Sequence, residues 1–215
     1  MAGQGATRNG GAGMTIIRTV EPADATGAVG EIYAEDVASL GYVPSHTRVM
    51  ATDPDALRAF EELAGRIASG LGPRLYELVT LAAARALRSE ACLLAHGRRS
   101  RSLFDDDQLA RIARDHHDAG LSDAEVAAMD LAARLSTDAP SITEAETERL
   151  RAAGLTDRQV VDVVLAAALR NYYSRALLAL AVPPDVPPDL PAGLRQALLE
   201  GVGSDVDPGS RASAR

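Results

Sequence analysis

The sequence has very few aromatic residues and a single cysteine. It contains no tryptophan, two phenylalanines and five tyrosines among 215 residues, so aromatic residues make up 3% of the chain. Cys92 is the only cysteine, so no disulfide can form within one chain. A redox role for this thiol therefore needs a second thiol supplied from elsewhere.

Long apolar runs and an excess of basic residues are also missing. No stretch reaches the roughly 18 continuous apolar residues of a membrane span, and residues 1–13 lack the hydrophobic centre of a signal peptide. The formal net charge is −8, and the one basic cluster, Arg98, Arg99 and Arg101, is short. The sequence therefore predicts a cytoplasmic protein with neither a membrane nor a nucleic acid as its partner.

Helix-forming residues dominate what remains. Alanine and leucine are abundant, and β-branched residues rarely alternate with polar ones as a strand would require, which predicts an all-α fold. Pro54 and Pro73 are placed to open helices, and Ser122, Thr143 and Thr156 are good N-cap residues. The expected helices cover residues 27–39, 54–69, 73–86, 90–98, 105–117, 123–136, 144–153 and 157–181.

The chain is expected to form one domain with irregular ends. Residues 1–14 are Gly-rich and predict a disordered leader, and residues 15–185 hold the helical domain. Residues 186–215 are Pro-rich and then polar, which predicts a mostly flexible tail. Within this tail only residues 192–200 look able to form a short helix.

An internal repeat is visible at an offset of 84 residues. Residues 71–96 align with residues 155–180, and the run Leu-Ala-Ala-Ala at 81–84 recurs at 165–168. We interpret the two segments as copies of a helical hairpin, although alanine-rich helices can also match by chance. Glu77, Cys92 and His96 align with Val161, Ala176 and Leu180, so the polar chemistry lies in the first copy.

Cys92 and His96 are the strongest candidates for a catalytic site. They stand four residues apart, which on a helix places both side chains on one face. Ser89 can cap a new helix whose first turn holds Cys92, and the helix dipole and the imidazole would both favour the thiolate. Glu77 can meet them only if the chain bends near Ser89, and it would then orient His96 as the base.

These residues resemble the signature of the alkyl hydroperoxidase D / carboxymuconolactone decarboxylase family. Glu77 is followed after eleven residues by Ser89-Glu90-Ala91-Cys92-Leu93-Leu94-Ala95-His96-Gly97, where the family has a glutamate, a Cys-x-x-Cys pair and a histidine. The likeness extends over roughly residues 21–185, through the segments 31–33, 43–44, 48–51, 53–54, 120–122, 153–157, 171–172 and 181–184.

The resemblance implies an all-α, AhpD-like fold that assembles into trimers, hexamers or dimers and uses no metal or organic cofactor. It also implies that Cys92 is the cysteine activated by His96 and Glu77. In redox members of the family the first cysteine of the pair forms the disulfide, and here that position holds Ser89. The intramolecular disulfide cycle is therefore unavailable to this chain.

Three functions remain open from the sequence. The first is a one-cysteine, alkylhydroperoxidase-like thiol oxidoreductase, in which Cys92 forms a sulfenic acid that an external thiol reduces. The second is a cofactor-independent lyase or isomerase that uses His96 or Glu77 as acid and base. The third is a catalytically silent helical scaffold. The alanine, leucine and valine around the site favour a small, mostly apolar substrate.

Several other polar residues are weaker candidates. Tyr172, Tyr173 and Arg175 align with the Ser89 region in the repeat and could form a substrate wall, although packing is the simpler role. His46, in a turn after Pro44, could line the mouth of a pocket.

The run from Asp115 through His116 and His117 to Asp118 contains potential metal ligands. Adjacent residues on a helix point about 100° apart, so we expect a solvated helix end here and no metal site.

Overall fold

The computed structural model describes residues 15–202, and these residues contain helices and no strand. This confirms the all-α prediction. The predicted leader, residues 1–14, and the last part of the predicted tail, residues 203–215, lie outside the described residues. The α-helices are α1 (Gly27–Leu40), α2 (Ser45–Met50), α3 (Pro54–Leu71), α4 (Pro73–Ala86), α5 (Glu90–Ser100), α6 (Asp106–Arg114), α7 (Asp123–Asp138), α8 (Glu144–Ala152), α9 (Asp157–Ala179) and α10 (Ala192–Leu199).

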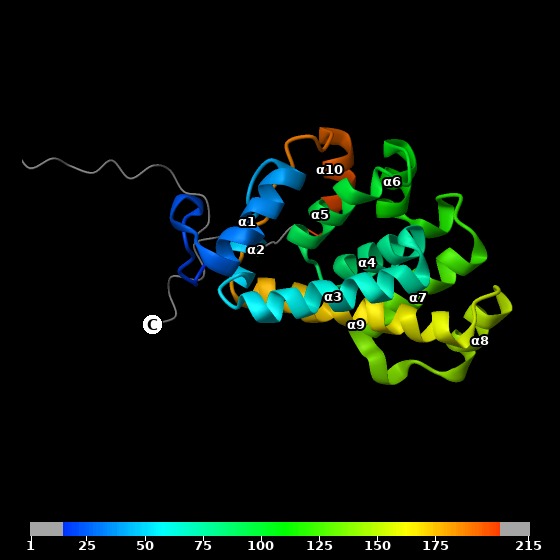
Figure 1. Cartoon of the computed structure of the whole chain (residues 1–215). Coiled ribbons are helices and arrows are strands. Elements are labelled where there is room, and N and C mark those ends of the chain that lie inside the picture. The colour runs from blue at the N-terminus through cyan, green and yellow to red at the C-terminus, as the bar shows by residue number, and fades with distance from the viewer. Residues whose placement is uncertain (1–14, 203–215) are drawn as a thin grey trace, which may run out of the picture.

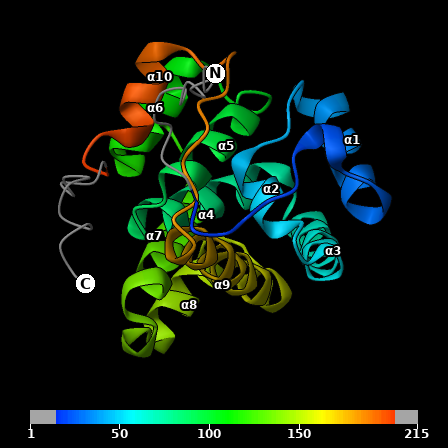
Figure 2. The same cartoon turned by 90° about the vertical axis from the view of Figure 1, so that its left-hand side faces the viewer.

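Helix α4 is the centre of the molecule. It packs against α3, α5, α7 and α9, and the end-on view in Figure 2 shows the other helices arranged around it. Every residue from Tyr76 to Ala84 is buried, including the polar Glu77 and Thr80. Because a helix enclosed on all sides has no solvent face, Glu77 points into the protein interior.

Local signals explain several helix starts. Pro54 and Pro73 stand at the first positions of α3 and α4, as the sequence predicted. Ser122 and Thr156 form capping boxes with Glu125 and Gln159, so the first amide groups of α7 and α9 are hydrogen-bonded. These contacts involve residues three apart in sequence and need no tertiary structure.

A sharp turn separates α4 from α5. Arg88 has a positive φ of 55°, the amide of Ser89 donates to Ala84 O at 2.9 Å, and the amide of Arg88 donates to Arg85 O at 2.9 Å. This pattern is a Schellman helix end, here built without glycine. Ser89 occupies the N-cap position of α5, but its side chain makes no capping hydrogen bond, in contrast to the prediction.

The two segments of the predicted repeat differ in shape. Residues 71–96 form α4, a turn and part of α5, whereas residues 157–179 form the single continuous helix α9. The predicted hairpin is therefore wrong for the second segment. Alanine-rich helices carry similar composition whether or not they are broken, and only the first segment contains the Leu87-Arg88-Ser89 turn.

The structure differs from the predicted elements at two places, one near the amino terminus and one after α6. Residues 45–50, expected to be a turn that holds His46, form helix α2. Helix α6 ends at Arg114 and not at His117, because Asp115 adopts an extended conformation and residues His116–Asp118 form a 3-10 turn.

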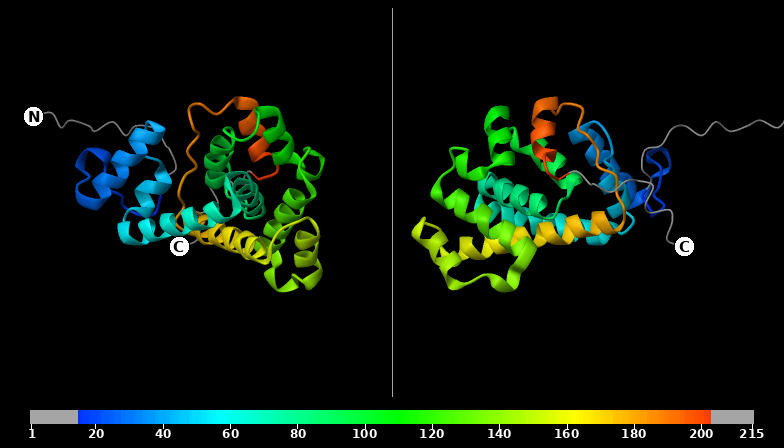
Figure 3. Two further views of the ribbon diagram at one scale, coloured as in Figure 1. Left: turned by 45° about the vertical axis from the view of Figure 1, so that its right-hand side comes forward. Right: turned by 180° about the vertical axis from the view of Figure 1, so that it is seen from behind.

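The predicted flexible tail is wrong for residues 186–202. A connecting segment leaves the end of α9, as the right-hand view of Figure 3 shows, and leads to α10, which packs against α5 and α6. Leu190, Leu194, Ala197, Leu198 and Val202 are all buried in the hydrophobic core. Leu194, Ala197 and Leu198 belong to α10, and Leu190 and Val202 flank it on either side. The proline-rich composition of the connection gave no indication that these apolar residues pack against the protein.

Candidate active site

Glu77 and His96 meet in the interior. Glu77 lies on α4 and His96 on α5, and the turn at Arg88 and Ser89 brings the two helices side by side. The distance from His96 Nδ1 to Glu77 Oε2 is 2.7 Å, and the two residues are 8% and 4% exposed. The bend that the sequence predicted near Ser89 is therefore the feature that lets residues 19 positions apart form a hydrogen bond.

The surroundings favour a neutral imidazole next to an ionised carboxylate. Burial lowers the pKa of His96, and the positive charge of Arg170 lowers it further, while Glu77 acts in the opposite direction. Burial alone would raise the pKa of Glu77, but His96, Arg99 and Arg170 outweigh it, so the net shift is downward. Neutral His96 then donates its Nδ1 hydrogen to Glu77, and its Nε2 lone pair is free to accept a proton.

Cys92 faces helix α9. Its Sγ atom lies 3.2 Å from Ser174 Oγ and 3.5 Å from Arg170 Nη1, both of which are placed to donate hydrogen bonds to the sulfur. Cys92 is 3% exposed. Within residues 15–202 no hydrogen bond joins Cys92 to His96.

Arg170 is the functional candidate that the sequence analysis missed. It is 5% exposed, and its Nε atom has no hydrogen-bond partner within the described part of the chain. Its guanidinium carbon lies 5.7 Å from the centre of the Tyr173 ring. The sequence signal that could have identified Arg170 is the presence of an arginine among the alanines and leucines of α9. A buried cation is costly unless an anion or a ligand compensates its charge.

A cavity of about 780 Å³ opens onto this group. Glu77, His96 and Arg170 line it, and the aliphatic and aromatic part of its wall includes Leu40, Leu57, Phe60, Tyr76 and Leu103. Cys92 is not among the lining residues. Since Arg170 both lines the cavity and contacts the sulfur, the thiol lies one side chain behind the cavity wall.

His46 and Tyr173, two of the residues proposed for the pocket, do line the cavity. Their rings meet edge to face with centres 6.1 Å apart. Burial lowers the pKa of His46 to about 4, with His96 and Arg170 contributing and Asp185 opposing the shift. His46 is therefore a second neutral imidazole in the same cavity.

The other three proposed pocket residues lie elsewhere. Ser89 is 1% exposed inside the turn between α4 and α5 and does not line the cavity. Tyr172 is 53% exposed and stacks on Phe60, and Arg175 is exposed and contacts Asn171. Tyr172 and Tyr173 both stack on Phe60, but only Tyr173 is buried and lines the cavity.

Solved structures share this architecture. The AhpD core of a peroxidase-related protein from Ralstonia eutropha JMP134 superimposes with a TM-score of 0.71 at 22% identity, covering 81% of this chain and 94% of that one. A peroxidase-related protein from Silicibacter sp. TM1040 gives a TM-score of 0.66 at 26% identity, covering 73% and 84%. The debrominase Bmp8, solved with 2,3,4-tribromopyrrole, gives 0.67 at 17% identity, covering 88% and 98%. The fold is that of the AhpD-like proteins.

The sequence itself matches the carboxymuconolactone decarboxylase family over residues 54–134. Together with the AhpD-like neighbours, this match confirms the resemblance to the alkyl hydroperoxidase D / carboxymuconolactone decarboxylase family. No protein of curated function matches the sequence. Among the helices of residues 15–202, none combines the length and the apolar character that crossing a bilayer demands.

Proposed function

We propose that this chain is a one-cysteine thiol oxidoreductase that reduces a small hydroperoxide at Cys92. The observation that carries the proposal is the pair of donors, Ser174 Oγ and Arg170 Nη1, directed at the Cys92 sulfur. A thiolate accepts hydrogen bonds far better than a thiol, and a neighbouring cation stabilises it further. Helix α9 thus supplies two hydrogen-bond donors, one of them a cation, to the sulfur that would attack the peroxide.

The Glu77–His96 pair completes the chemistry. The peroxide has to pass the Arg170 side chain, which lies between the cavity and the sulfur, to reach Cys92. His96 then accepts the thiol proton at Nε2, through the bound peroxide, while Glu77 stabilises the imidazolium that forms. The thiolate attacks the terminal oxygen of the hydroperoxide, the O–O bond breaks, and Cys92 becomes a sulfenic acid. The alkoxide that leaves takes the proton from His96, so the products are the alcohol and the sulfenic acid.

Regeneration requires two equivalents of an external thiol. The first attacks the sulfenic acid and releases water, and the second reduces the mixed disulfide, which returns Cys92 as a thiol and yields the external disulfide. Cys92 is the only cysteine in the sequence, so the second sulfur has to come from a partner molecule. The apolar wall formed by Leu40, Leu57 and Phe60 supports a small, mostly apolar body for the peroxide.

The test is to trap the sulfenic acid at Cys92 with a dimedone-type probe after addition of an alkyl hydroperoxide. We expect a stoichiometric adduct in the unmodified chain and none in Cys92→Ser. Arg170→Gln and Ser174→Ala should each slow adduct formation, by about 10-fold or more for the charged Arg170, because a hydrogen bond from a charged group is lost.

Arg175→Gln is the matched control, since Arg175 lies on the same helix but is exposed and does not contact the sulfur. The proposal is wrong if no hydroperoxide yields an adduct, or if Arg170→Gln reacts as fast as Arg175→Gln.

A cofactor-independent lyase or isomerase is the second candidate, and one observation favours it. His96 and Glu77 line the cavity, whereas Cys92 does not. A substrate in the cavity could exchange protons with His96 Nε2 without meeting the sulfur. Activity that survives in Cys92→Ser but is lost in His96→Gln would select this candidate. A catalytically silent scaffold would show no activity that depends on Cys92 or on His96. Such a role also does not explain why a buried carboxylate and a buried imidazole face each other.

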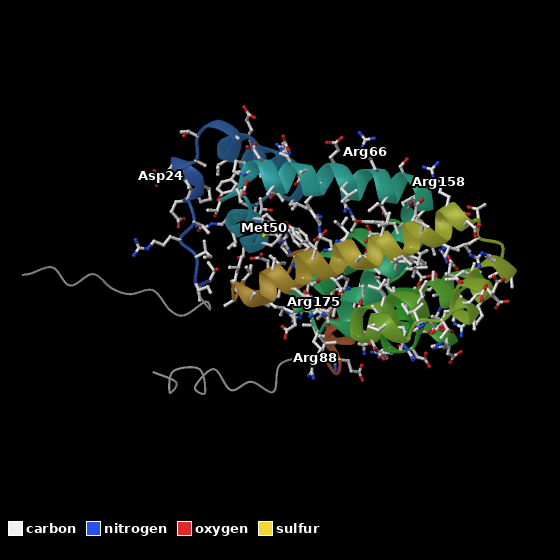
Figure 4. The ribbon with its side chains drawn as sticks, turned by 90° about the horizontal axis from the view of Figure 1, so that it is seen from below. Asp24, Met50, Arg66, Arg88, Arg158 and Arg175 are labelled. Atoms are coloured by element: carbon white, nitrogen blue, oxygen red, sulfur yellow. The ribbon has the colours of Figure 1, made fainter. Side chains whose placement is uncertain are left out.

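We also propose that copies of the chain associate through α3 and α9, which lie side by side on the face shown in Figure 4. Leu63 on α3 is 47% exposed, and Val161, Leu165 and Tyr172 on α9 are 55%, 44% and 53% exposed. The three α9 residues fall within about 40° of one another around the helix axis. Neighbouring exposed apolar side chains of this size support a protein interface.

A further inference from the structure

A second group of polar side chains lies far from the cavity described above, at the end of α6. Asp115 is extended, with φ −152° and ψ 105°, and His116 and His117 follow in a 3-10 turn. The sequence analysis expected these residues to diverge around a helix. Because the helix ends at Arg114, they converge instead, and one ligand atom from each of Asp115, His116 and His117 lies within 4.8 Å of the others.

Asp130, on helix α7, contacts both histidines. Its Oδ1 atom lies 2.9 Å from His116 Nε2 and 3.0 Å from His117 Nε2. The two imidazole rings are 4.1 Å apart between centres. Two ring nitrogens thus approach one carboxylate oxygen. In a tetrahedral zinc site with bonds of about 2.0–2.1 Å, neighbouring ligand atoms are about 3.3 Å apart, so both nitrogen–oxygen distances are within a few tenths of an ångström of a ligand spacing.

Hydrogen bonds from neighbouring residues orient two of the three proposed ligands, His117 and Asp130. His117 Nδ1 lies 3.0 Å from Asp115 Oδ1, so the carboxylate of Asp115 orients the ring and leaves Nε2 to face Asp130. Arg149 Nη2 donates to Asp130 Oδ2 at 3.0 Å, which leaves Oδ1 toward the histidines. A carboxylate bound to the far nitrogen of a histidine and a hydrogen bond on a ligating carboxylate are the usual outer partners of metal sites.

We propose that His116, His117 and Asp130 form a binding site for a divalent transition-metal ion, with Asp115 and Arg149 as its outer partners. Two imidazoles and one carboxylate suit zinc better than magnesium or calcium, which prefer oxygen ligands. The side chains of His117 and Asp115 are 57% and 63% exposed, so an ion has a path to the site and water can fill the remaining coordination position.

The site would link the turn after α6 to helix α7. His116 and Asp130 are 14 residues apart in sequence, and the segment between them contains Gly120 in a left-handed conformation. An ion bound by the folded chain and not by the unfolded chain stabilises the fold by mass action. The inference does not depend on the proposed chemistry at Cys92, because none of these residues lines that cavity.

The test is isothermal titration calorimetry with Zn²⁺ at about pH 7, where an ordinary imidazole is mostly neutral and Zn²⁺ stays in solution. The experiment uses the full chain carrying Cys92→Ser, because a free thiol is itself a strong ligand for Zn²⁺. We expect one equivalent of Zn²⁺, a loss of most of the affinity in His116→Gln, His117→Gln and Asp130→Asn, and a decrease of about 10–100-fold in Asp115→Asn.

Asp118→Asn is the matched control, since Asp118 is an acidic residue of the same turn whose carboxylate does not bond to the histidines, and it should bind as the parent does. Circular dichroism verifies that each variant is folded, and Zn²⁺ should raise the unfolding temperature of the parent but not of His117→Gln. Absence of binding at millimolar Zn²⁺ overturns the inference, as does binding that His116→Gln and His117→Gln leave unchanged.

Discussion

At the residue scale, the carboxylate of Glu77 controls what His96 can do. In Glu77→Gln the amide can present an N–H to Nδ1 and favour the tautomer with the hydrogen on Nε2, which is the wrong one for a base. We expect the rate of sulfenic acid formation to fall by about 100-fold or more, measured in single turnover. Glu61→Gln is the control, because Glu61 lines the same cavity but pairs with Arg58 and not with His96.

The pH profile gives an independent measure of the same residue. Since the pKa of His96 is lowered, its basic form persists below the ordinary histidine value of about 6.5, and activity should fall only at more acidic pH. Glu77 raises the pKa of His96, so in Glu77→Gln the loss of activity on the acidic side of the pH profile should occur at a still lower pH. A limb at or above pH 6.5 in the unmodified chain would contradict the assignment of neutral His96 as the base.

His46 makes a prediction about stability. Its pKa in the folded protein is about 4, so between that value and its ordinary value of about 6.5 the unfolded chain binds more protons than the folded one. The free energy of unfolding should therefore decrease as the pH falls through this window, by up to about 3 kcal/mol from this residue.

His46→Gln should remove this part of the pH dependence. Urea unfolding at several pH values between those limits measures it, and the comparison of the two chains cancels the contribution of the carboxylates, which both contain. Parallel curves for the two chains would show that His46 is not held neutral in the folded state.

At the scale of elements, the docking of α10 on α5 depends on Gly97. A Cβ atom added to Gly97 would lie 2.3 Å from Leu198 Cδ1, and Leu198 is 1% exposed. Figure 1 shows α10 lying against α5 and α6 at the top of the molecule. Gly97→Ala should destabilise the protein by about 1–3 kcal/mol through overpacking, measured by urea unfolding.

A double mutant separates steric overlap from other effects. Leu198→Ala alone should also destabilise, because it leaves a cavity, but Gly97→Ala should cost much less when Leu198 is already alanine. Additive losses would show that the two residues do not interact. Gly193→Ala is a suitable control within α10, because a Cβ atom there meets nothing within 4 Å.

The elements also show where local sequence signals stop being informative. Pro54, Pro73, Ser122 and Thr156 mark helix starts that the structure reproduces, because a cap or a first-turn proline acts over three or four residues. Helix α10 was only half predicted: its residues were identified, but its burial in the core was not. That burial depends on the surfaces of α5 and α6, about 90 residues earlier in the chain.

At the scale of the whole molecule, the apolar face formed by α3 and α9 is the prediction to test. Leu165→Glu should shift the chain toward monomers in sedimentation experiments, since a charge in the centre of an apolar interface is costly to bury. Val37→Glu on α1 is the control, because Val37 is 50% exposed but lies on another helix. An unchanged assembly in Leu165→Glu would place the interface elsewhere.

The candidate site depends both on local spacing in the sequence and on packing between distant helices. The spacing of Glu77, Ser89, Cys92 and His96 predicted a bend that lets the acid reach the histidine, and the structure places the two in contact. Arg170 and Ser174, which contact the sulfur, are 78 and 82 residues from Cys92. No local pattern connects residues so far apart, because their meeting depends on how α9 packs against α5.

The sequence by itself determined the all-α class and most helix boundaries, because these follow from composition and from signals within a few residues of each other. Only the tertiary structure decided which side of Cys92 carries the cation, that His46 and Tyr173 face the cavity while Tyr172 and Arg175 do not, and that two adjacent histidines meet Asp130. These facts depend on packing between distant helices, which is a property of the whole folded chain.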